Sequence, residues 1–148
     1  MREPWRSHLL ETPEQIGKLL DRIHTVAVLG IKTDVDPDQP AWYVPKYAQR
    51  SGMKIVPVPV YFPDATMILG ETVYRTVSAI SGAVDLVDVF RRPKDIPSHV
   101  DDILAKRPAA VWFQLGIRDD ESAGHFAKAG IDVVQDRCLL VELQIRGR

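Results

Sequence analysis

The sequence predicts an α/β protein with a Rossmann-like fold, in which a doubly wound, mainly parallel sheet carries helices on both faces. Three observations support this fold class. Short apolar runs that end at glycine or proline alternate with stretches that carry helix signals. Such alternation is typical of right-handed crossovers between parallel strands. The 148 residues contain no repeat, linker or low-complexity tract, so we expect a single domain over residues 1–148.

The first two elements carry the clearest signals. A helix is predicted at about residues 13–22, because Thr12 can cap it and Gln15 completes a capping box. Pro13 also suits its first turn. The run TVAVLG at residues 25–30 follows, and it is continuously apolar up to its glycine. Such a run is typical of a strand that is buried on both faces, as in the middle of a parallel sheet.

The later elements are bounded by glycine, proline and polar residues. They are a helix at 40–51, strands at 54–59 and, briefly, 72–74, a helical turn at 75–81, a strand at 84–90, a helix at 97–106, a strand at 109–114, a helix at 119–129 and a strand at 131–134. After the last strand we expect a tail with a polar end. The expected strand order is the doubly wound 3-2-1-4-5, with a flavodoxin-like order as the alternative.

Composition argues against several classes of partner and location. The net charge of −1 offers no basic face for nucleic acid, so we expect no nucleic-acid partner. No stretch approaches the roughly 18 apolar residues of a membrane span, and the first residues are too polar for a secretory signal. The single cysteine, Cys138, has no partner for an internal disulfide, which fits a reducing compartment. We therefore expect a cytoplasmic protein with no membrane partner.

Topology predicts where a ligand binds. In an open α/β sheet the ligand crevice lies beyond the carboxyl ends of the strands, here after Gly30, Pro59, Phe90 and Gln114. Gly30 allows a sharp turn close to a ligand, and the helix start behind it offers free N–H groups that favour phosphate. Lys32 adds a cation beside them. The alternative is that Gly30 only ends a strand and Lys32 is solvated.

A dinucleotide site of the NAD type is disfavoured. The fingerprint G-x-G-x-x-G needs two further glycines, and those positions hold Lys32 and Val35. The end of the second strand has no acid that could bind a ribose diol. After the strand at 84–90, Arg91 and Arg92 can instead hold phosphate oxygens or stack on a purine. Equally, they can form a solvated turn or pair with nearby aspartates.

The chain resembles the small stand-alone CoA-binding proteins, whose domain is similar to the N-terminal CoA-binding domain of the succinyl-CoA synthetase α subunit. The resemblance covers about residues 24–142, which we expect to be the core of the domain. Its motifs are VAVLG at 26–30, Pro40 with Tyr43, Val44 and Tyr47, VPV at 56–58, ILGE at 68–71, VDLVDVFRR at 84–92, Trp112 with QLGI at 114–117, and DRC at 136–138. Each motif is weak by itself, but together in this order and spacing they are specific.

The resemblance implies that coenzyme A binds at the carboxyl ends of the strands. It places the pyrophosphate beside Pro40 and the segment Gly30, Ile31, Lys32 and Thr33, and the adenosine against two loops, at Pro59 and Val60 and at Phe90, Arg91 and Arg92. The 3′-phosphate of CoA would be held by Arg91 or Arg92. The resemblance supplies neither the catalytic histidine domain nor the nucleotide-grasping subunit of the synthetase, so its ligase activity is not expected.

Residues for catalysis or metal binding are not evident. Cys138 is expected to be structural, the four histidines are dispersed, and no cluster has metal-ligand spacing, so we predict no catalytic and no metal residue. The expected function is binding of CoA or an acyl-CoA, without catalysis. One alternative is an enzyme that uses NAD(P) or a CoA thioester. The other is an interaction module with a vestigial nucleotide crevice. The acyl group, the protein partners and the oligomeric state are not determined by these patterns.

Overall fold

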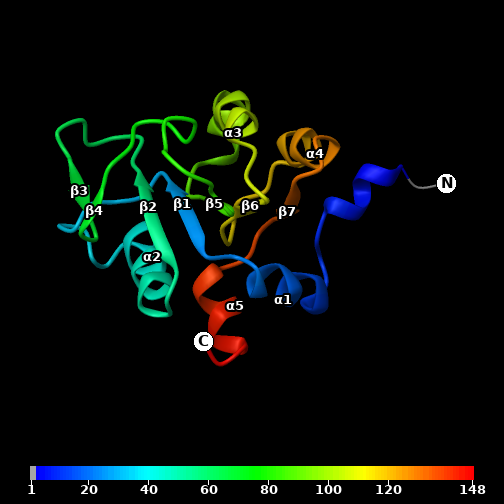
Figure 1. Ribbon diagram of the computed structural model, residues 1–148, viewed down its shortest axis with the longest axis horizontal. Coiled ribbons are helices and arrows are strands. Elements are labelled where there is room, and N and C mark those ends of the chain that lie inside the picture. The colour runs from blue at the N-terminus through cyan, green and yellow to red at the C-terminus, as the bar shows by residue number, and fades with distance from the viewer. Residues whose placement is uncertain (1–2) are drawn as a thin grey trace.

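A computed structural model describes residues 3–148 of the chain (Figure 1). The α-helices are α1 (Pro13–Asp21), α2 (Pro40–Arg50), α3 (Val100–Lys106), α4 (Asp120–Lys128) and α5 (Leu139–Ile145). The strands are β1 (Thr25–Leu29), β2 (Lys54–Val58), β3 (Met67–Ile68), β4 (Glu71–Thr72), β5 (Leu86–Val89), β6 (Ala110–Phe113) and β7 (Asp132–Val134). Short 3-10 helices are η1 (Pro4–His8), η2 (Pro93–Asp95) and η3 (Pro97–His99). Among these residues, no helix is both long and apolar enough to cross a membrane.

The main sheet confirms the predicted fold class. Its five strands lie in the order β2-β1-β5-β6-β7, and every neighbouring pair is parallel. Counted along the chain, this order is 2-1-3-4-5. The expected order 3-2-1-4-5 is therefore wrong for this sheet, and the flavodoxin-like alternative is right. The strand order reverses between β1 and β5, so the carboxyl ends of these two strands flank the crevice that topology predicts.

The segment 72–74 explains the difference in strand order. It lies beside β2, where the Tyr74 N–H donates to the Pro57 carbonyl over 3.0 Å, but it does not extend the sheet. Pro57 has no N–H, so the outer edge of β2 cannot form a continuous ladder. Instead β3 and β4 pair with each other in an antiparallel hairpin, which projects beyond β2 in Figure 1.

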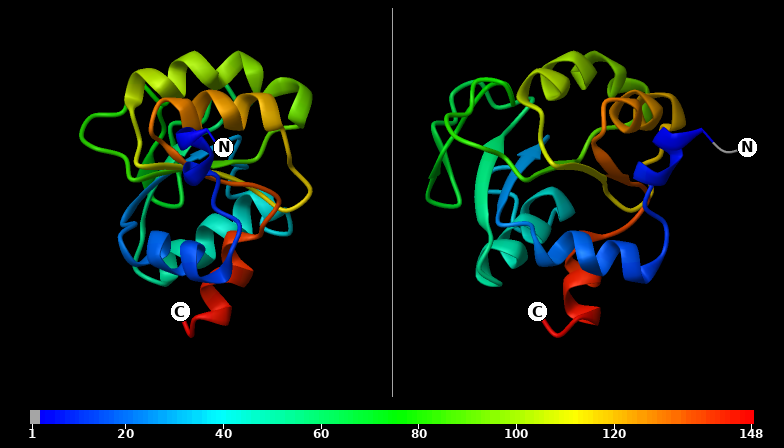
Figure 2. Two further views of the ribbon diagram at one scale, coloured as in Figure 1. Left: turned by 90° about the vertical axis from the view of Figure 1, so that its right-hand side faces the viewer. Right: turned by 45° about the vertical axis from the view of Figure 1, so that its right-hand side comes forward.

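Helices cover both faces of the sheet, as predicted. Figures 1 and 2 show α1, α2 and α5 on one face and α3 and α4 on the other. Side chains alternate along each strand, so the two faces build two hydrophobic clusters. In β5, for example, Leu86 belongs to the cluster under α1, α2 and α5, whereas Val87 and Val89 belong to the other. No strand in this sheet needs a polar face, because both faces are covered.

Helix α1 forms as its capping signals predict. The Thr12 hydroxyl accepts a hydrogen bond from the Gln15 N–H over 3.2 Å, and the Gln15 side chain accepts from the Thr12 N–H over 3.0 Å. This reciprocal pair satisfies two N–H groups that the helix leaves free. Its apolar side, which includes Ile16, Leu19 and Leu20, is buried against the sheet.

Helix α2 begins at Pro40, although Pro45 lies within it. Proline has no N–H, so the Ala41 carbonyl one turn earlier loses its helical partner. The N–H of Lys32 takes that place, with a distance of 3.1 Å to the Ala41 oxygen. The proline thereby ties the loop after β1 to the first turn of α2.

Two expectations about irregular segments are corrected. Residues 75–81 contain no helix: they form bends around a single turn, which is closed by a hydrogen bond from the Ile80 N–H to the Val77 carbonyl. The expected tail contains α5, whose Leu139 and Leu143 are fully buried. A helix of 7 residues offers little periodicity, and no side chain caps its N-terminus, so its sequence signal is weak.

Candidate functional site

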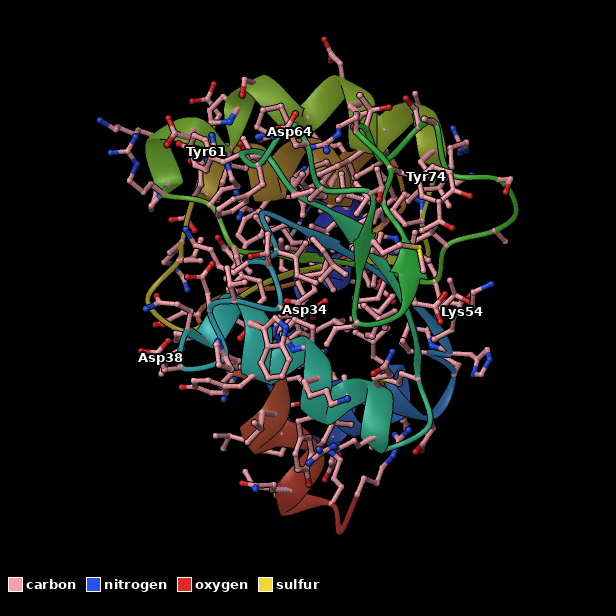
Figure 3. All side chains as sticks on the ribbon, turned by 90° about the vertical axis from the view of Figure 1, so that its left-hand side faces the viewer. Asp34, Asp38, Lys54, Tyr61, Asp64 and Tyr74 are labelled. Atoms are coloured by element: carbon pink, nitrogen blue, oxygen red, sulfur yellow. The ribbon has the colours of Figure 1, made fainter. Side chains whose placement is uncertain are left out.

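The loops after β1, β2, β5 and β6 meet at the carboxyl edge of the sheet. Figure 3 shows this edge from the side of β2: Lys54, at the start of that strand, lies at the right, and Tyr61 and Asp38 lie at the left. Asp34, in the loop after β1, lies over α2 between them. We call the residues at these loops the rim. Because this edge is where the strand order reverses, the rim is the place to test the predicted ligand residues.

Gly30 brings two of the rim loops into contact. Its φ of +86° is a left-handed conformation that side chains rarely adopt. A Cβ there would lie 2.2 Å from the Phe90 carbonyl oxygen and 3.3 Å from Cδ of Arg91. The Gly30 N–H also donates to the Val58 carbonyl over 2.9 Å. Only glycine permits this junction of three segments. The alternative interpretation, in which Gly30 only ends a strand, is therefore incomplete.

Lys32 lies at the rim as a cation without a carboxylate partner among residues 3–148. Its side chain is half-buried, and its ammonium lies 5.5 Å from the centre of the Phe62 ring. Because its N–H is bound to Ala41, the backbone there is occupied and the side chain is the group that remains available. Thr33, next in the chain, donates its hydroxyl to Asp36 over 3.3 Å.

Asp34 does not compete for that cation. Its Oδ1 accepts hydrogen bonds from the Trp42 indole over 2.9 Å and from the Leu69 N–H over 3.1 Å. The carboxylate therefore joins the loop after β1 to α2 and to the turn between β3 and β4. Trp42 itself is half-buried.

Arg91 is the most constrained cation at the rim. Its side chain is 13% exposed and lies 3.8 Å from the Asp95 carboxylate. Its Nε donates to Nε2 of His99 over 3.2 Å, and its guanidinium lies 5.5 Å from the centre of the Tyr61 ring. A hydrogen bond from Arg91 lowers the pKa of the Tyr61 hydroxyl. Burial, followed by the charge of Arg91, lowers the pKa of His99, so His99 stays a neutral acceptor.

Arg92 differs from Arg91. Its side chain is 66% exposed and reaches Asp95, with 2.8 Å between Nε and the carboxylate. This hydrogen bond is the main reason why the pKa of Asp95 is lowered. Of the aspartates that the sequence offered as partners for the arginines, Asp95 is the one in contact with both. An exposed pair of this kind is weak and can be exchanged for a ligand phosphate.

Sequence reasoning missed the aromatic loop that follows Val60. Tyr61 and Phe62 present their rings to Arg91 and Lys32, respectively. A guanidinium nitrogen of Arg75 lies 3.0 Å from the Phe62 carbonyl, 3.0 Å from that of Pro63 and 2.7 Å from that of Ala65. The only signal in the sequence is the aromatic pair placed just after a strand end, because Arg75 is distant along the chain.

The other predicted rim residues contribute backbone or packing. Ile31 is 1% exposed and belongs to the core under α2, so its side chain cannot reach a ligand. Pro59 is buried, and Val60 is half-buried against the core on the other face. Phe90 packs on the α2 side, and Pro40 is exposed at the start of that helix.

A buried polar pair lies below the rim on the α2 side. Asp88 of β5 is fully buried, and its Oδ1 accepts from the Gln114 amide over 2.7 Å. Its Oδ2 has no partner among the described residues. Burial raises the pKa of Asp88 to about 7, although the hydrogen bond from Gln114 acts in the opposite direction. Gln114 is 3% exposed and borders a cavity of about 190 Å³ at the rim.

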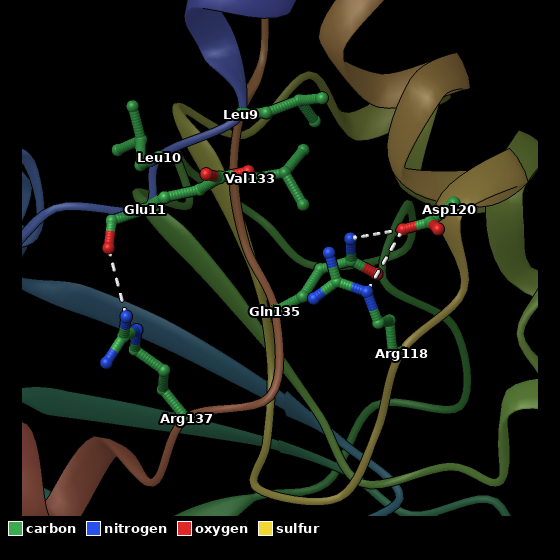
Figure 4. Close-up of a pocket in the computed structure, with 8 residues that line it drawn as sticks. All are labelled: Leu9, Leu10, Glu11, Arg118, Asp120, Val133, Gln135 and Arg137. Carbon is green, nitrogen blue, oxygen red and sulfur yellow. Dashed lines mark hydrogen bonds and ion pairs between the residues drawn. The ribbon is translucent and has the colours of Figure 1, made fainter.

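A larger cavity, of about 390 Å³, lies beside β7, the outer strand on the side of the sheet away from β2 (Figure 4). Its two cations are engaged within the protein. Arg118 lies 3.3 Å from the Asp120 carboxylate, and Arg137 donates to the Glu11 carbonyl over 2.9 Å. Because it is distant from the point where the strand order reverses, we assign the candidate site to the rim and not to this cavity.

Comparisons with known sequences give matches over most of the chain. A family model described as CoA binding domain matches residues 24–144. The chain is 29% identical over 127 residues to the uncharacterized protein YneT of Bacillus subtilis, and the match covers 86% of this chain and 90% of YneT.

Solved structures show the same fold. Cell-free ID.343 from Thermus thermophilus is 36% identical with a TM-score of 0.83, and the match covers 91% of this chain and 98% of that one. A hypothetical protein from Pyrococcus horikoshii is 29% identical with a TM-score of 0.82, with 98% of each chain covered. The dinucleotide forming acetyl-coenzyme A synthetase 1 of Ca. Korarchaeum cryptofilum, at 18% identity and a TM-score of 0.62, shares the fold over 74% of this chain and 25% of its own.

Proposed function

Because this chain belongs to the CoA binding domain family, we propose that it binds coenzyme A or an acyl-CoA at the rim, without catalysing a reaction of its own. The observation that carries the proposal is the junction at Gly30. It brings the loop that bears Lys32 against the loop that bears Arg91. Two cations then lie on adjoining loops where the strand order reverses, which suits a ligand with phosphates at both ends of a ribose.

The pyrophosphate is proposed to lie along Gly30 to Thr33, at the start of α2. The ammonium of Lys32 faces the Phe62 ring and has no carboxylate partner in the described part of the chain, so it can approach a phosphate. In the first turn of α2, Pro40 has no N–H and the N–H groups of Trp42 and Tyr43 donate to the Gln39 carbonyl, so the turn offers the Ala41 N–H and the positive end of the helix dipole. Asp34 is bound to Trp42 and Leu69, which orients its carboxylate toward α2 and the turn between β3 and β4.

The adenosine end is proposed to lie between the aromatic loop and Arg91. Tyr61 is 57% exposed, so its ring is available for stacking on a base. Arg91 is held in place by His99 and Asp95, whereas Arg92 is 66% exposed and its pair with Asp95 can be exchanged for a phosphate. We propose that these two arginines bind the 3′-phosphate, the group that distinguishes CoA from dephospho-CoA.

The test is thermal unfolding with CoA, dephospho-CoA, NAD and NADPH. A ligand at a hundredfold excess over its Kd stabilises a one-site protein by about 2.7 kcal/mol. We expect that stabilisation with CoA, a smaller shift with dephospho-CoA and none with the two dinucleotides. The double variant Arg91→Ala/Arg92→Ala should lose the preference for CoA. Arg50→Ala, an exposed arginine on α2, is the matched control.

Each other outcome rejects part of the proposal. Equal stabilisation by CoA and dephospho-CoA would remove the assigned role of the two arginines. A shift with NADPH and none with CoA would favour a dinucleotide enzyme. Thioester turnover that disappears in Cys138→Ser would contradict the absence of catalysis. A folded protein that no nucleotide stabilises would instead fit an interaction module.

A further inference from the structure

An apolar cavity adjoins the rim on the α2 side. It has a volume of about 190 Å³ and lies at the carboxyl ends of β5 and β6, beside the start of α2. Its apolar lining consists of Pro40, Tyr43, Val44, Phe90, Leu115 and Ile117. Gln114 and Cys138 complete the wall. Pro40 and Phe90 also belong to the rim, so the cavity is continuous with the proposed path of CoA.

Exposed apolar side chains mark the wall of this cavity. Leu115 is 69% exposed and Tyr43 is 41% exposed, and both are large hydrophobic residues. Leu115 lies in the loop directly after β6, and Tyr43 lies in the first turn of α2. Apolar groups that are exposed together at a concave site indicate that an apolar group of a ligand covers them.

The cavity offers no charge to a ligand. None of its lining residues is a lysine, arginine, aspartate or glutamate. Its one amide is already engaged, because Gln114 donates to Asp88 over 2.7 Å and accepts from the Leu139 N–H over 3.4 Å. A carboxylate that entered would lose its water without gaining a cation, which is strongly unfavourable.

We propose that this cavity binds the acyl group of a CoA thioester, and that the acyl group is short and uncharged. The inference rests on the proposed function, because the thioester must be delivered by CoA bound at the rim. A volume of about 190 Å³ is below the range of drug-sized pockets, so a long chain does not fit within it. Dicarboxylic acyl groups such as succinyl and malonyl are excluded by the lack of a cation.

The experiment measures the Kd of CoA, acetyl-CoA, butyryl-CoA, octanoyl-CoA and succinyl-CoA by calorimetry. Each buried methylene should tighten binding about fourfold, so affinity should rise from acetyl to butyryl. The gain should stop when the chain outgrows the cavity, between butyryl and octanoyl. Succinyl-CoA should bind at least about tenfold more weakly than butyryl-CoA.

Variants assign the effect to the cavity. Leu115→Asp places a carboxylate at its wall and should weaken the binding of butyryl-CoA more than that of free CoA, which removes most of the preference for butyryl-CoA. Ile145→Asp is the matched control, because Ile145 is also 69% exposed but lies on α5, outside the cavity. Ile117→Phe fills part of the volume and should shift the optimum from butyryl to acetyl.

Failure of this inference is distinct from failure of the proposed function. If CoA binds but the acyl group changes the Kd by less than twofold, the cavity does not hold it and the inference is wrong. Succinyl-CoA binding as tightly as butyryl-CoA would also overturn it. If neither CoA nor any thioester binds, the proposed function itself is rejected.

Discussion

Gly30, in the loop after β1, and Asp88, in β5, show how single residues determine the structure at the rim and below it. Gly30 acts through the absence of a side chain, because a Cβ would overlap the Phe90 carbonyl. Asp88 acts through burial. It is a carboxyl group in the interior of a sheet, and within residues 3–148 its one hydrogen-bond donor is Gln114. The role of Gly30 could be expected from a glycine at a strand end, whereas no sequence pattern indicates the burial of Asp88.

Asp88 should make stability depend on pH. Burial raises its pKa from the ordinary 3.8 to about 7 in the folded protein. Between these values the folded protein keeps a proton that the unfolded chain has released, so stability falls as pH rises from about 4 to about 7. The variant Asp88→Asn has no carboxyl group to titrate at this position, so it should lack this dependence of stability on pH. Its stability relative to the natural chain should therefore rise between pH 5 and pH 8, by an amount on the order of a few kcal/mol.

Urea unfolding across that pH range measures the difference. Asp101→Asn removes an exposed carboxylate from the first turn of α3 and is the control. It should keep a constant offset from the natural chain. A constant offset for Asp88→Asn as well would mean that Asp88 is ionised in the folded protein throughout the range.

At the scale of elements, one arginine organises the aromatic loop. Arg75 binds the carbonyls of Phe62, Pro63 and Ala65, and so holds Tyr61 and Phe62 against the two cations of the rim. It touches neither cation itself. We regard it as a positioning residue for the proposed ligand site.

Arg75→Ala should weaken CoA binding more than it lowers stability. Without Arg75, the rings of Tyr61 and Phe62 would have to be ordered when the ligand binds. This ordering costs about 1–3 kcal/mol of binding free energy, so the Kd should rise about tenfold. The melting temperature should change little, because Arg75 is exposed. In a background of Tyr61→Ala/Phe62→Ala, the effect of Arg75→Ala on the Kd should shrink. An undiminished effect there would mean that Arg75 acts on the ligand directly.

At the scale of the whole molecule, the C-terminal helix closes the core. Leu139 and Leu143 of α5 pack under the sheet, beside α1 and α2. The end of the chain is tied to α1, where Arg146 donates to the Pro13 carbonyl over 2.7 Å and Arg148 donates to the Leu20 carbonyl over 3.1 Å. Helix α5, which has the weakest sequence signal of the α-helices, therefore helps α1 and α2 to cover one face of the sheet.

Leu143→Ala should destabilise the protein by about 2–5 kcal/mol, because it leaves a cavity in a fully buried site. Differential scanning calorimetry should show a fall of about 5–15 °C in the melting temperature. Ile145→Ala, on the same helix but 69% exposed, should stay within about 0.5 kcal/mol. Equal losses in the two variants would show that α5 contributes through its backbone and not through burial of Leu143.

Patterns along the chain predicted the alternation of elements, the fold class and the edge of the sheet where a ligand is expected. Those features follow from local signals: the capping box at Thr12, the apolar run that ends at Gly30, and the glycine and proline boundaries. The family resemblance also came from short motifs in a fixed order.

The strand order, the contacts of Lys32 and Arg91, and the cavity beside Phe90 could be read from the folded chain alone. Strand order depends on backbone pairing between distant segments, and Pro57 prevents a pairing that the local pattern allowed. The rim contacts join residues from different loops, such as Arg75 with Phe62. Burial, as at Asp88, is a property of packing, so a pattern along the chain carries no record of it.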